Sequence, residues 1–556
     1  MNDVMEPLKG MLVVGGGNVG ARVARVLLNE GQTVFATTTR RTHQLTLERM
    51  GAQVIPWRWE EGASWEALES LGCEAWCVTV PPRGGQAHAE AFHRALQAAA
   101  RKAGVRRLLW TSSTAVYGGC AKSVMSEGDA GHVQSRHTGV DLLALEAVHR
   151  TSEGPEFVAM RLGGLYGQGM HPALSVSRRS PVREVDGDVQ WVHLDDAAKA
   201  CATALMATTL EGATALNVVA PKVRSRLALL EATFPSDAMP AMEHGGQQRQ
   251  VSSDKLMRLG FTFEHPDVAA WCKDQLGVWK TETWDGPHGP LRVDRHPSKA
   301  PHQAVRGRLL MVHGYKGFKS WGNWPGLADR WSRLGWEVHR MDFSHNGHVP
   351  PFDEDCADEA AWSANRHHFE AEEVAFALHH LSSSEGLPLV VLGHSRGGGM
   401  AVLGARRFES EGGTLAGCAA WASVSDFVGR MPQGEVLERW RVTDRLEVVN
   451  GRTGQTLVHP FAFCEETLAR REALDVIEAS RALNSPLLAV HGTDDPVVAW
   501  QEGKALVKVA QRPTWSPIDG GNHVFGMTHP WPPSQPWPEP LTAATEATEA
   551  WLQSIA

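Results

Sequence analysis

The chain has 556 residues, of which 42% are hydrophobic and 21% charged, and its formal net charge is −9. This composition excludes disordered and collagen-like chains, and at about 150 residues per domain the length predicts two to four domains. The negative charge argues against a nucleic-acid partner. No apolar run approaches the roughly 18 residues of a membrane helix, and the first residues do not resemble a signal peptide, so we expect no membrane association. Eight scattered cysteines indicate reduced thiols and a cytoplasmic location.

Apolar strand-like runs alternate with helix-like runs through the first half of the chain. The predicted elements are strands at residues 11–14, 33–37, 74–80 and 107–111 and a helix at 21–29. Such alternation is typical of an α/β fold in which crossover helices cover both faces of a parallel sheet. We therefore predict a doubly wound parallel sheet in this half.

A glycine-rich segment follows the first strand directly. Residues 15–20 read GGGNVG, which fits the pattern G-x-G-x-x-G. In this pattern the first glycine permits a tight turn, the second lets the backbone approach a pyrophosphate, and the third lets the helix pack close to the strand. The segment predicts a dinucleotide site made by Gly15, Gly17, Asn18, Val19 and Gly20.

The end of the next strand bears on the choice of nucleotide. An NAD site carries an acidic residue about 20 residues downstream for the ribose hydroxyls. Here residues 38–41 read TTRR, and the planar guanidinium of Arg40 is suited to a 2′-phosphate. We therefore expect NADP(H), with NAD(H) as the alternative. The simpler interpretation is that Arg40 and Arg41 are surface charges.

Three further motifs occur in order in the first half. Residues 110–118 read WTSSTAVYG, 161–167 read RLGGLYG and 191–198 read WVHLDDAA. Together with the glycine segment, they resemble the extended short-chain dehydrogenase/reductase family, which includes nucleotide-sugar epimerases and dehydratases, over residues 8–280. The resemblance implies a Rossmann core to about residue 165, followed by a small substrate-binding part. It also places Ser113, four residues before Tyr117, in the cofactor site.

One feature of that family is missing from this sequence. Family members carry a Tyr-x-x-x-Lys pair in which the tyrosine exchanges a proton. Thr138 and Leu142 occupy the matching positions, and neither Tyr117 nor Tyr166 is followed by lysine four residues later. The first half thus resembles atypical family members that lack this pair. His137 is an alternative proton donor; a solvent-facing histidine at a helix start is the simpler interpretation.

A proline-, glycine- and histidine-rich stretch interrupts the periodic pattern after residue 284. We expect a first domain at 1–284, a linker at 285–304 and a second domain at 305–556. The second domain begins again with an apolar strand at 308–312, which predicts another α/β fold. Further strands are predicted at residues 336–341, 389–392 and 487–490.

A segment within the second domain has the pattern of a lid. Residues 446–453 read LEVVNGRT, where Asn-Gly predicts a hairpin turn. We expect a lid at about residues 425–470 that sets substrate choice. Its arginines Arg441, Arg445 and Arg452 hint at an anionic substrate, although exposed arginines on a mobile segment are the more ordinary explanation.

A serine lies on a predicted strand-to-helix turn in the second domain. Residues 393–397 read GHSRG, which fits G-x-S-x-G and makes Ser395 the candidate nucleophile. A serine requires a base and a group that orients the base. Downstream, HGTDD at 491–495 supplies carboxylates after a strand, and His523 lies in a glycine-rich loop. The order Ser, Asp, His is that of the α/β hydrolases.

The second half thus resembles the α/β-hydrolase superfamily, with dienelactone-hydrolase-like and acyl-peptidase-like members, over residues 305–556. The pattern H-G-x-x-D-x-x-V in such proteins assigns the acid to Asp495, with Asp494 as the alternative. The segment HGYKGF at 313–318 resembles the oxyanion loop of the family. The resemblance implies that the backbone amides of Tyr315 and Arg396 stabilise the developing negative charge.

The sequence therefore predicts an NADP-binding Rossmann domain followed by a serine hydrolase that cleaves a carboxylic ester or related acyl bond of a small molecule. Two alternatives remain open for the first half: an active reductase or epimerase, or a non-catalytic module that senses nucleotide or mediates assembly. We expect no metal ion in either half. The oligomeric state is not indicated by the sequence.

Overall fold

The chain folds into two compact units, each of which we describe by itself in the computed structural model. The first unit comprises Met1–Thr233, Pro240–Lys273 and Val349–Phe352, and the second comprises Phe234–Met239, Asp274–His348 and Asp353–Ala556. The structure describes residues 8–60, 63–134, 139–150, 154–167, 169–177, 181–208, 210, 215–234, 236, 239–275, 277–299, 305–349, 352–382, 386–532 and 535–555.

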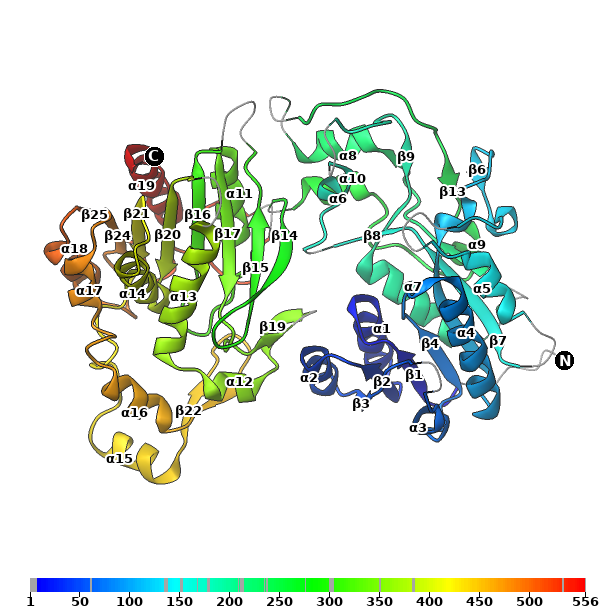
Figure 1. Cartoon of the computed structure of the whole chain (residues 1–556), viewed down its shortest axis with the longest axis horizontal. Helices are drawn as coiled ribbons and strands as arrows, with labels where there is room; N and C mark the ends of the chain where they lie inside the picture. The colour runs from blue at the N-terminus through cyan, green and yellow to red at the C-terminus, as the bar shows by residue number, and fades with distance from the viewer. Residues whose placement is uncertain are drawn as a thin grey trace. The chain divides into compact units, whose positions relative to one another are not determined.

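A seven-stranded sheet forms the centre of the first unit (Figure 1). Its order is β11-β7-β5-β4-β1-β2-β3, and all neighbouring strands are parallel. The strands are β1 (Met11–Val14), β2 (Val34–Thr38), β3 (Gln53–Pro56), β4 (Ala75–Val78), β5 (Arg107–Ser113), β7 (Glu156–Leu162) and β11 (Ala215–Val218). The order reverses between β1 and β4, and such a switch point is where open α/β sheets bind ligands.

Helices cover both faces of this sheet, as predicted. The helices are α1 (Asn18–Asn29), α2 (Arg41–Arg49), α3 (Glu66–Glu69), α4 (Gly85–Lys102), α5 (Leu142–Val148) and α7 (Leu194–Met206), with 3₁₀ turns η1 (Thr114–Tyr117) and η2 (Glu127–Asp129). Successive residues of β1 face opposite sides: Val13 packs in the core with α1 and α7, whereas Leu12 and Val14 pack in the core with α4 and α5. A strand buried on both faces reads as a continuous apolar run, which is the pattern seen in the sequence.

Short elements form a smaller part of the first unit. Three two-stranded sheets pair β10 with β8, β12 with β9 and β13 with β6. The strands are β6 (Val124–Met125), β8 (Gly164–Tyr166), β9 (Asp188–Val189), β10 (Trp191–His193), β12 (Arg224–Ser225) and β13 (Gln250–Val251), and the helices are α6 (Pro172–Val176), α8 (Arg226–Thr233), α9 (Asp254–Arg258) and α10 (Val268–Lys273).

The second unit is built on an eight-stranded sheet of order β14-β15-β17-β16-β20-β21-β24-β25. The strands β14 and β15 are antiparallel to their neighbours, and the other neighbouring pairs are parallel. The strands are β14 (Lys280–Asp285), β15 (Pro290–His296), β16 (Gly307–Val312), β17 (Trp336–Asp342), β20 (Leu389–His394), β21 (Gly417–Trp421), β24 (Leu487–Gly492) and β25 (Pro513–Ile518).

The predicted linker at 285–304 is wrong over its first part. Residues 290–296 form β15, which pairs with β14 and β17, so this hairpin belongs to the second unit. Leu291 and Val293 are buried in the core, and Asp294 is buried because Arg340 and Lys319 contact its carboxylate. The N-terminal part of the first unit correspondingly extends to Lys273 and not to residue 284. Residues 300–304 lie outside the described part of the chain.

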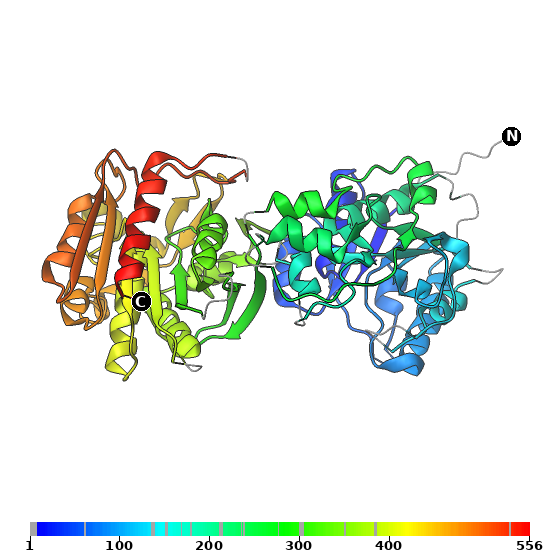
Figure 2. The same cartoon turned by 90° about the horizontal axis from the view of Figure 1, so that it is seen from above.

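Helices also enclose the second sheet on two faces. Residues of α13, α14, α17 and α18 pack in one core, and residues of α11 and α19 pack in the other. Figure 2 shows the C-terminal helix α19 alongside the strands. The helices are α11 (Trp324–Arg333), α12 (Glu359–Ala364), α13 (His367–Ser382), α14 (Arg396–Ser410), α17 (Val476–Ala482), α18 (Trp500–Val509) and α19 (Glu539–Ile555), and two short strands, β18 (His348–Val349) and β19 (Phe352–Cys356), pair with each other.

The predicted lid segment is a compact insertion between β21 and α17. It contains α15 (Gly434–Thr443), β22 (Leu446–Val449), β23 (Thr456–His459) and α16 (Ala462–Ala469). The strands β22 and β23 are antiparallel, which confirms the predicted hairpin. A small core of its own, which includes Trp440 and Phe463, holds the insertion together.

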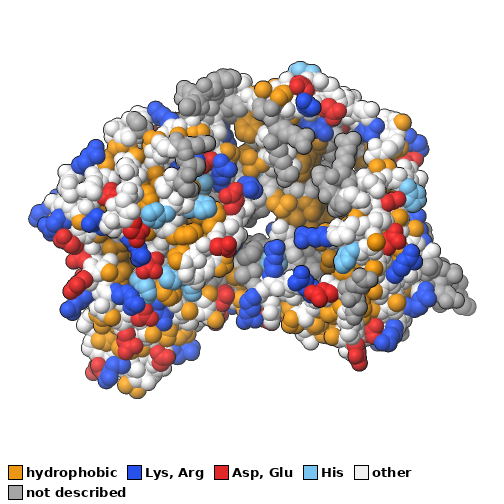
Figure 3. All heavy atoms as spheres, in the orientation of Figure 1, with side chains coloured by type: hydrophobic (Ala, Val, Ile, Leu, Met, Phe, Trp, Pro, Cys, Tyr) orange, Lys and Arg blue, Asp and Glu red, His pale blue; other side chains and the backbone are white. Residues whose placement is uncertain are grey.

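The surface is mixed in character. On the face shown in Figure 3, acidic and basic side chains are interspersed on each unit. Among the helices in the described ranges, none has both the length and the apolar character required to cross a membrane.

Candidate functional sites

Ser395 lies at the sharp turn between β20 and α14. Its backbone has φ +57° and ψ −124°, a conformation that L-residues rarely adopt. A Cβ at Gly393 would lie 2.0 Å from the carbonyl oxygen of Gly397, and one at Gly397 would lie 2.3 Å from that of His313. Both positions therefore require glycine. The strained turn exposes Ser395 at the carboxyl end of the strand.

His523 and Asp495 lie next to Ser395, although they come from different loops. Ser395 Oγ is 3.0 Å from His523 Nε2, and His523 Nδ1 is 2.8 Å from Asp495 Oδ2. Asp495 follows β24 and His523 follows β25. Because parallel strands end at the same edge of the sheet, the loops after β20, β24 and β25 meet there.

Asp495 is held in its ionised form. Burial alone would raise the pKa of its carboxyl group, but hydrogen bonds from the His491 and His523 side chains and from the backbone N–H of Val498 outweigh this effect and hold the pKa well below its usual range. Asp495 Oδ1 accepts hydrogen bonds from the N–H groups of Val497 and Val498 at 2.8 and 2.9 Å. The alternative acid, Asp494, is exposed and contacts Thr493, so it does not reach His523.

The two residues expected to form the oxyanion site lie on either side of Ser395. Arg396 is the first residue of α14, where an N–H group has no intrahelical acceptor. A Cβ at Gly314 would lie 3.0 Å from Ser395 Cβ, so the loop that carries Tyr315 passes close to the serine. The side chains are also linked, because the Arg396 guanidinium lies 4.4 Å from the Tyr315 ring centroid.

Several supporting residues were not predicted from the sequence. Glu370 of α13 accepts a hydrogen bond from Arg396 Nη2 at 2.5 Å, and His459 Nε2 of β23 lies 2.8 Å from the Tyr315 hydroxyl. His394 Nε2 donates to the backbone carbonyl of His523 at 2.8 Å. Burial, followed by the charge of His523, lowers the pKa of His394 to about 3, so its imidazole stays neutral. Of these supporting residues, only His394 could have been found from the sequence, because it lies inside the G-x-S-x-G pattern.

A cavity of about 200 Å³ opens onto Ser395 and His523. Its walls come from the oxyanion loop, from the two aromatic residues Trp321 and Trp324, and from the lid hairpin through Asn450 and Arg452. The lid thus contributes side chains to this cavity. Residues 343–348, which follow the nearby strand β17, do not line it.

The glycine segment of the first unit has the geometry its sequence predicts. Gly15 has φ +102°, which favours glycine. A Cβ at Gly20 would lie 2.1 Å from the Gly15 carbonyl oxygen, whereas a Cβ at Gly17 would meet open space. Gly17 precedes α1 without a side-chain cap, so the N–H groups of Asn18 and Val19 at the first turn suit an anion.

The structure places Arg40 and Ser113 at the same edge of the first sheet. Arg40 is exposed just after β2, and β2 lies beside the glycine segment because Gly16 N donates to the Thr37 carbonyl at 2.6 Å. Ser113 is the last residue of β5, and its Oγ accepts a hydrogen bond from Ala115 N at 3.2 Å. These residues fit a dinucleotide whose pyrophosphate lies at the start of α1.

The positions of the missing acid–base pair are described only in part. His137 and Thr138 lie outside the described residues, whereas Leu142 begins α5 and is buried. The hydroxyl of Tyr117 is 2.6 Å from Asn217 Oδ1 and 2.9 Å from Arg161 Nη1, in the interior.

The chain contains a Tyr-x-x-x-Lys spacing in the second unit, at Tyr315 and Lys319. The Lys319 ammonium lies 3.1 Å from Asp294 Oδ2 and is buried. The Tyr315 hydroxyl faces His459, as described above. Neither residue belongs to the dinucleotide fold, so the spacing supplies no proton exchange there.

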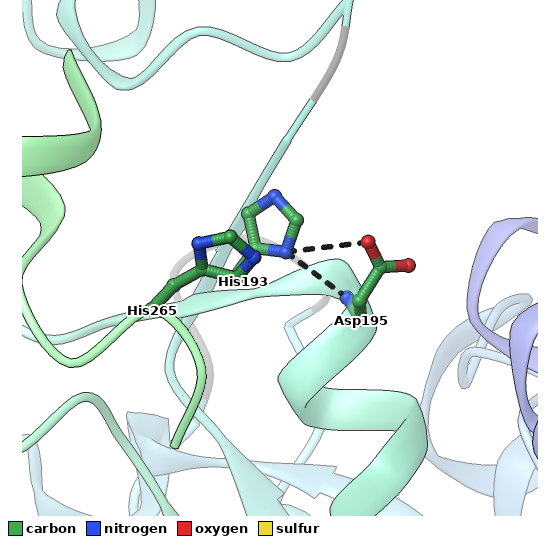
Figure 4. A group of neighbouring side chains, drawn as sticks. All are labelled: His193, Asp195 and His265. Atoms are coloured by element: carbon green, nitrogen blue, oxygen red, sulfur yellow. Dashed lines mark hydrogen bonds and ion pairs between the residues drawn. The ribbon is translucent and has the colours of Figure 1, made fainter. Parts of the chain in front are cut away.

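His193, Asp195 and His265 form a cluster of potential metal ligands in the first unit (Figure 4). His193 Nδ1 already accepts a hydrogen bond from Asp195 N at 3.3 Å. Asp195 Oδ1 is 2.9 Å from Arg22 Nε and 3.7 Å from Arg25 Nη2. Because two guanidinium groups neutralise the carboxylate and would repel a cation, we assign no metal to this cluster.

The folds and loops define two classes of domain: a Rossmann-type nucleotide-binding domain and an α/β-hydrolase domain. Comparison with family models agrees. Residues 15–207 match the NAD(P)H-binding family, and residues 303–524 match the family described as serine aminopeptidase, S33. The chain therefore combines an NAD(P)-binding domain with an α/β-hydrolase domain. No curated protein matches the chain.

Solved structures similar to this chain each correspond to about half of it. A conserved protein of unknown function from Silicibacter pomeroyi DSS is 19% identical, covers 47% of this chain and 96% of its own, and has a TM-score of 0.38. Est1E from Butyrivibrio proteoclasticus is 14% identical, with coverages of 50% and 98% and a TM-score of 0.36. UDP-N-acetylglucosamine 4-epimerase from Bacillus cereus is 16% identical, with coverages of 47% and 97% and a TM-score of 0.36.

Proposed function

We propose that the second unit is a serine hydrolase that cleaves a carboxylic ester or a related acyl bond. The observation that carries this proposal is the continuous hydrogen-bonded chain from Ser395 through His523 to Asp495, at a strained turn that opens into a cavity. Such a chain turns a weakly nucleophilic hydroxyl into a nucleophile. The family match supports hydrolysis, and its description names an aminopeptidase and not an esterase.

In the mechanism we propose, His523 Nε2 takes the proton of Ser395 while Oγ attacks the ester carbonyl carbon. The N–H groups of Tyr315 and Arg396 stabilise the resulting oxyanion. The intermediate collapses, the alcohol leaves with the proton from His523, and an acyl-serine remains. Water then attacks this ester with His523 as the base, which releases the carboxylic acid and restores Ser395. Asp495 stabilises the imidazolium throughout.

The direct test is the Ser395→Ala variant with 4-nitrophenyl acetate as the substrate. We expect kcat/KM to fall by about 10⁴-fold or more, with an unchanged circular dichroism spectrum. A fluorophosphonate probe should label the wild type on the peptide that contains Ser395 and leave the variant unlabelled. Equal ester hydrolysis by the two proteins, or labelling at another serine, would refute the assignment.

For the first unit, we propose NADP(H) binding without hydride-transfer catalysis. The turn at Gly15, the open space at Gly17, the first-turn N–H groups of Asn18 and Val19, and the close packing at Gly20 support a dinucleotide. Arg40 favours the 2′-phosphate of NADP(H) over NAD(H). When bound, the nucleotide would supply a hydride. The hydroxyl of Tyr117 is buried and bonded to Asn217 and Arg161, so it is not placed to exchange a proton with a substrate. This supports nucleotide binding without catalysis.

Titration with NADPH and NADH, followed by tryptophan fluorescence, tests this proposal. We expect binding of NADPH that is tighter than that of NADH, and loss of this preference in Arg40→Ala. Equal affinity for the two nucleotides would contradict the role of Arg40. Oxidation of NADPH that disappears in His137→Ala would instead favour an active reductase or epimerase.

We also propose a reducing, cytoplasmic location and a small-molecule substrate. None of the eight cysteines, all of which lie in the described ranges, forms a disulfide, and seven of them are buried. Mixed surface charge supports neither a nucleic-acid partner nor a membrane surface.

A further inference from the structure

The cavity beside Ser395 is strongly biased toward positive charge. Its lining includes two cationic side chains, Lys316 and Arg452, and no lining residue within the described ranges carries a carboxylate. Two cations in one partly enclosed space repel each other unless an anion joins them. From this lining we infer that the substrate carries an anionic group, a carboxylate or a phosphate, which Lys316 and Arg452 bind next to the scissile bond. The inference rests on the proposed hydrolase function and narrows its substrate class.

The Lys316 ammonium makes one hydrogen bond to the backbone and has further N–H donors for a ligand. Its backbone has φ +57°, a conformation that is uncommon outside glycine. Its ammonium donates to the Val449 carbonyl at 3.2 Å and lies 5.5 Å from the Tyr315 ring centroid. An ammonium carries three donors, and the structure shows no ion pair for Lys316 among the residues it describes. Burial lowers the pKa of Lys316, whereas a carboxylate partner would raise it.

Arg452 reaches the cavity from the turn of the lid hairpin. Two backbone hydrogen bonds close this turn, from Asn450 N to Gln455 O and from Gly454 N to Asn450 O, both at 2.8 Å. The guanidinium lies 5.2 Å from the Phe318 ring centroid. A guanidinium is suited to a carboxylate or a phosphate, because its parallel N–H groups can bind two oxygens of either anion.

The other lid arginines have a different environment. Arg441 Nη2 is 2.8 Å from Glu438, and Arg445 Nε is 2.9 Å from Glu447; all four side chains are more than half exposed. Neither arginine lines the cavity. Of the three lid arginines considered from the sequence, the structure thus supports Arg452 alone as a substrate contact, and Arg441 becomes a matched control.

The test uses the full-length protein with three pairs of substrates. The first pair is 4-nitrophenyl hydrogen glutarate and 4-nitrophenyl pentanoate, which differ by a carboxylate on the acyl chain. The second is 4-acetoxybenzoate and phenyl acetate, and the third is 4-acetoxyphenyl phosphate and phenyl acetate, which place a carboxylate or a phosphate on the leaving group. In the wild type we expect kcat/KM to be about tenfold or more higher for the anionic member of at least one pair.

The variants are Lys316→Met and Arg452→Gln, with Arg441→Gln as the control. We expect each of the first two to lower the ratio of anionic to neutral kcat/KM by about tenfold or more, and the control to leave the ratio within about twofold. The pair that shows the effect identifies the anion and the side of the bond that carries it. A ratio near one for all three pairs in the wild type, or the same ratio in all variants, would overturn the inference.

A binding measurement separates this inference from the proposed function. Trp321 and Trp324 line the cavity, so titration of Ser395→Ala with glutarate and with inorganic phosphate can be followed by fluorescence. We expect saturable binding of one anion, lost when Lys316→Met and Arg452→Gln are added. Anion binding by Ser395→Ala, together with no ester hydrolysis by the wild type, would refute the hydrolase proposal and keep the anion site. Ester hydrolysis through Ser395 with no anion binding and no charge preference would do the opposite.

Discussion

At the carboxyl edge of the second sheet, Ser395, His523 and Asp495 form one chain of hydrogen-bonded side chains, whereas the corresponding edge of the first sheet offers the backbone N–H groups at the start of α1. Both edges collect loops from parallel strands. The difference lies in what the loops contain. Side chains with matched acid and base roles can break bonds, whereas a glycine turn and a helix start provide binding. If the proposed functions hold, the same architecture supports catalysis in one unit and nucleotide binding in the other.

The largest expected effect distinguishes Asp495 from its neighbour Asp494 in the second unit. Asp495→Asn should lower kcat by about 10³- to 10⁴-fold, because His523 loses the group that fixes its tautomer. The matched variant Asp494→Asn should change kcat less than about twofold, since this carboxylate is exposed and contacts Thr493. Hydrolysis of 4-nitrophenyl acetate measures both. A larger loss in Asp494→Asn would show that the acid is assigned to the wrong residue.

In the first unit, substitutions of two glycines of the glycine-rich segment 15–20 should have different effects. Gly20→Ala forces a Cβ to within 2.1 Å of the Gly15 carbonyl oxygen, so the unit should lose about 1–3 kcal/mol of stability. Gly17→Ala meets open space, so stability should be retained while NADPH affinity falls by about tenfold or more, because the methyl group takes the place of the pyrophosphate. Calorimetry and nucleotide titration distinguish the two; lost stability in Gly17→Ala would contradict the prediction.

A buried carboxyl group should make the stability of the second unit fall as the pH rises from about 4.5 to 8. Burial raises the pKa of Glu373 to about 8, against hydrogen bonds from Ser344, while the ordinary value is 4.5. The unfolded chain therefore releases this proton near pH 4.5 and the folded chain near pH 8, so stability falls as pH rises between these values. From pH 5 to 8, the unfolding temperature of the wild type should fall by roughly 5 °C more than that of Glu373→Gln.

The exposed Glu478 provides the control for this measurement. It pairs with Arg481 on the surface, so Glu478→Gln should show the pH dependence of the wild type. Equal pH dependence in the wild type and Glu373→Gln would show that Glu373 does not titrate in this way.

The smallest expected effect lies in the first unit and has the opposite sign. His93 Nδ1 and His149 Nε2 lie 2.8 Å apart in the interior. Burial, with the charge of His149 as a second cause, lowers the pKa of His93 to about 3, and burial lowers that of His149 to about 4. The unfolded chain therefore takes up protons at these histidines at a higher pH than the folded chain. As a result, the free energy of unfolding falls as the pH decreases from about 6.5 toward 4.

The double variant His93→Gln, His149→Gln should therefore lose less stability between pH 6.5 and 4.5 than the wild type. We expect a difference of roughly 3 °C in the unfolding temperature of the first unit, measured by calorimetry. His244→Gln, at an exposed position, should retain the wild-type dependence. An identical change in unfolding temperature between pH 6.5 and 4.5 in all three proteins would contradict the prediction. It would show that the buried pair binds the same number of protons in the folded and the unfolded chain.

Local patterns in the sequence predicted most strands near the two sites. The apolar runs before residue 15 and before residue 393 are buried on both faces, so their pattern is continuous and easy to detect. The glycine segment and the G-x-S-x-G segment were also predictable, because each requires glycine at fixed positions. These features depend on neighbours in the chain and not on distant contacts.

The hairpin of β14 and β15 was missed for a physical reason. Its turn is rich in proline and glycine, and in β15 only Leu291 and Val293 alternate with charged residues, which is too short a run to predict a strand. Asp294 is nevertheless buried, because its charge is neutralised by Arg340 of β17 and by Lys319, which follows the oxyanion loop. Partners 46 and 25 residues away cannot be read from a local pattern.

The sequence by itself determined which reactive groups the protein has and on which strand ends they lie, because strand periodicity and glycine requirements are local properties. Only the tertiary structure decided which groups meet. It brings Lys316 and Arg452 into one cavity with Ser395, and it leaves Arg441 and Arg445 on the surface with their acidic neighbours. Distances between residues far apart in the chain depend on how loops from different strands pack, and no local pattern encodes that packing.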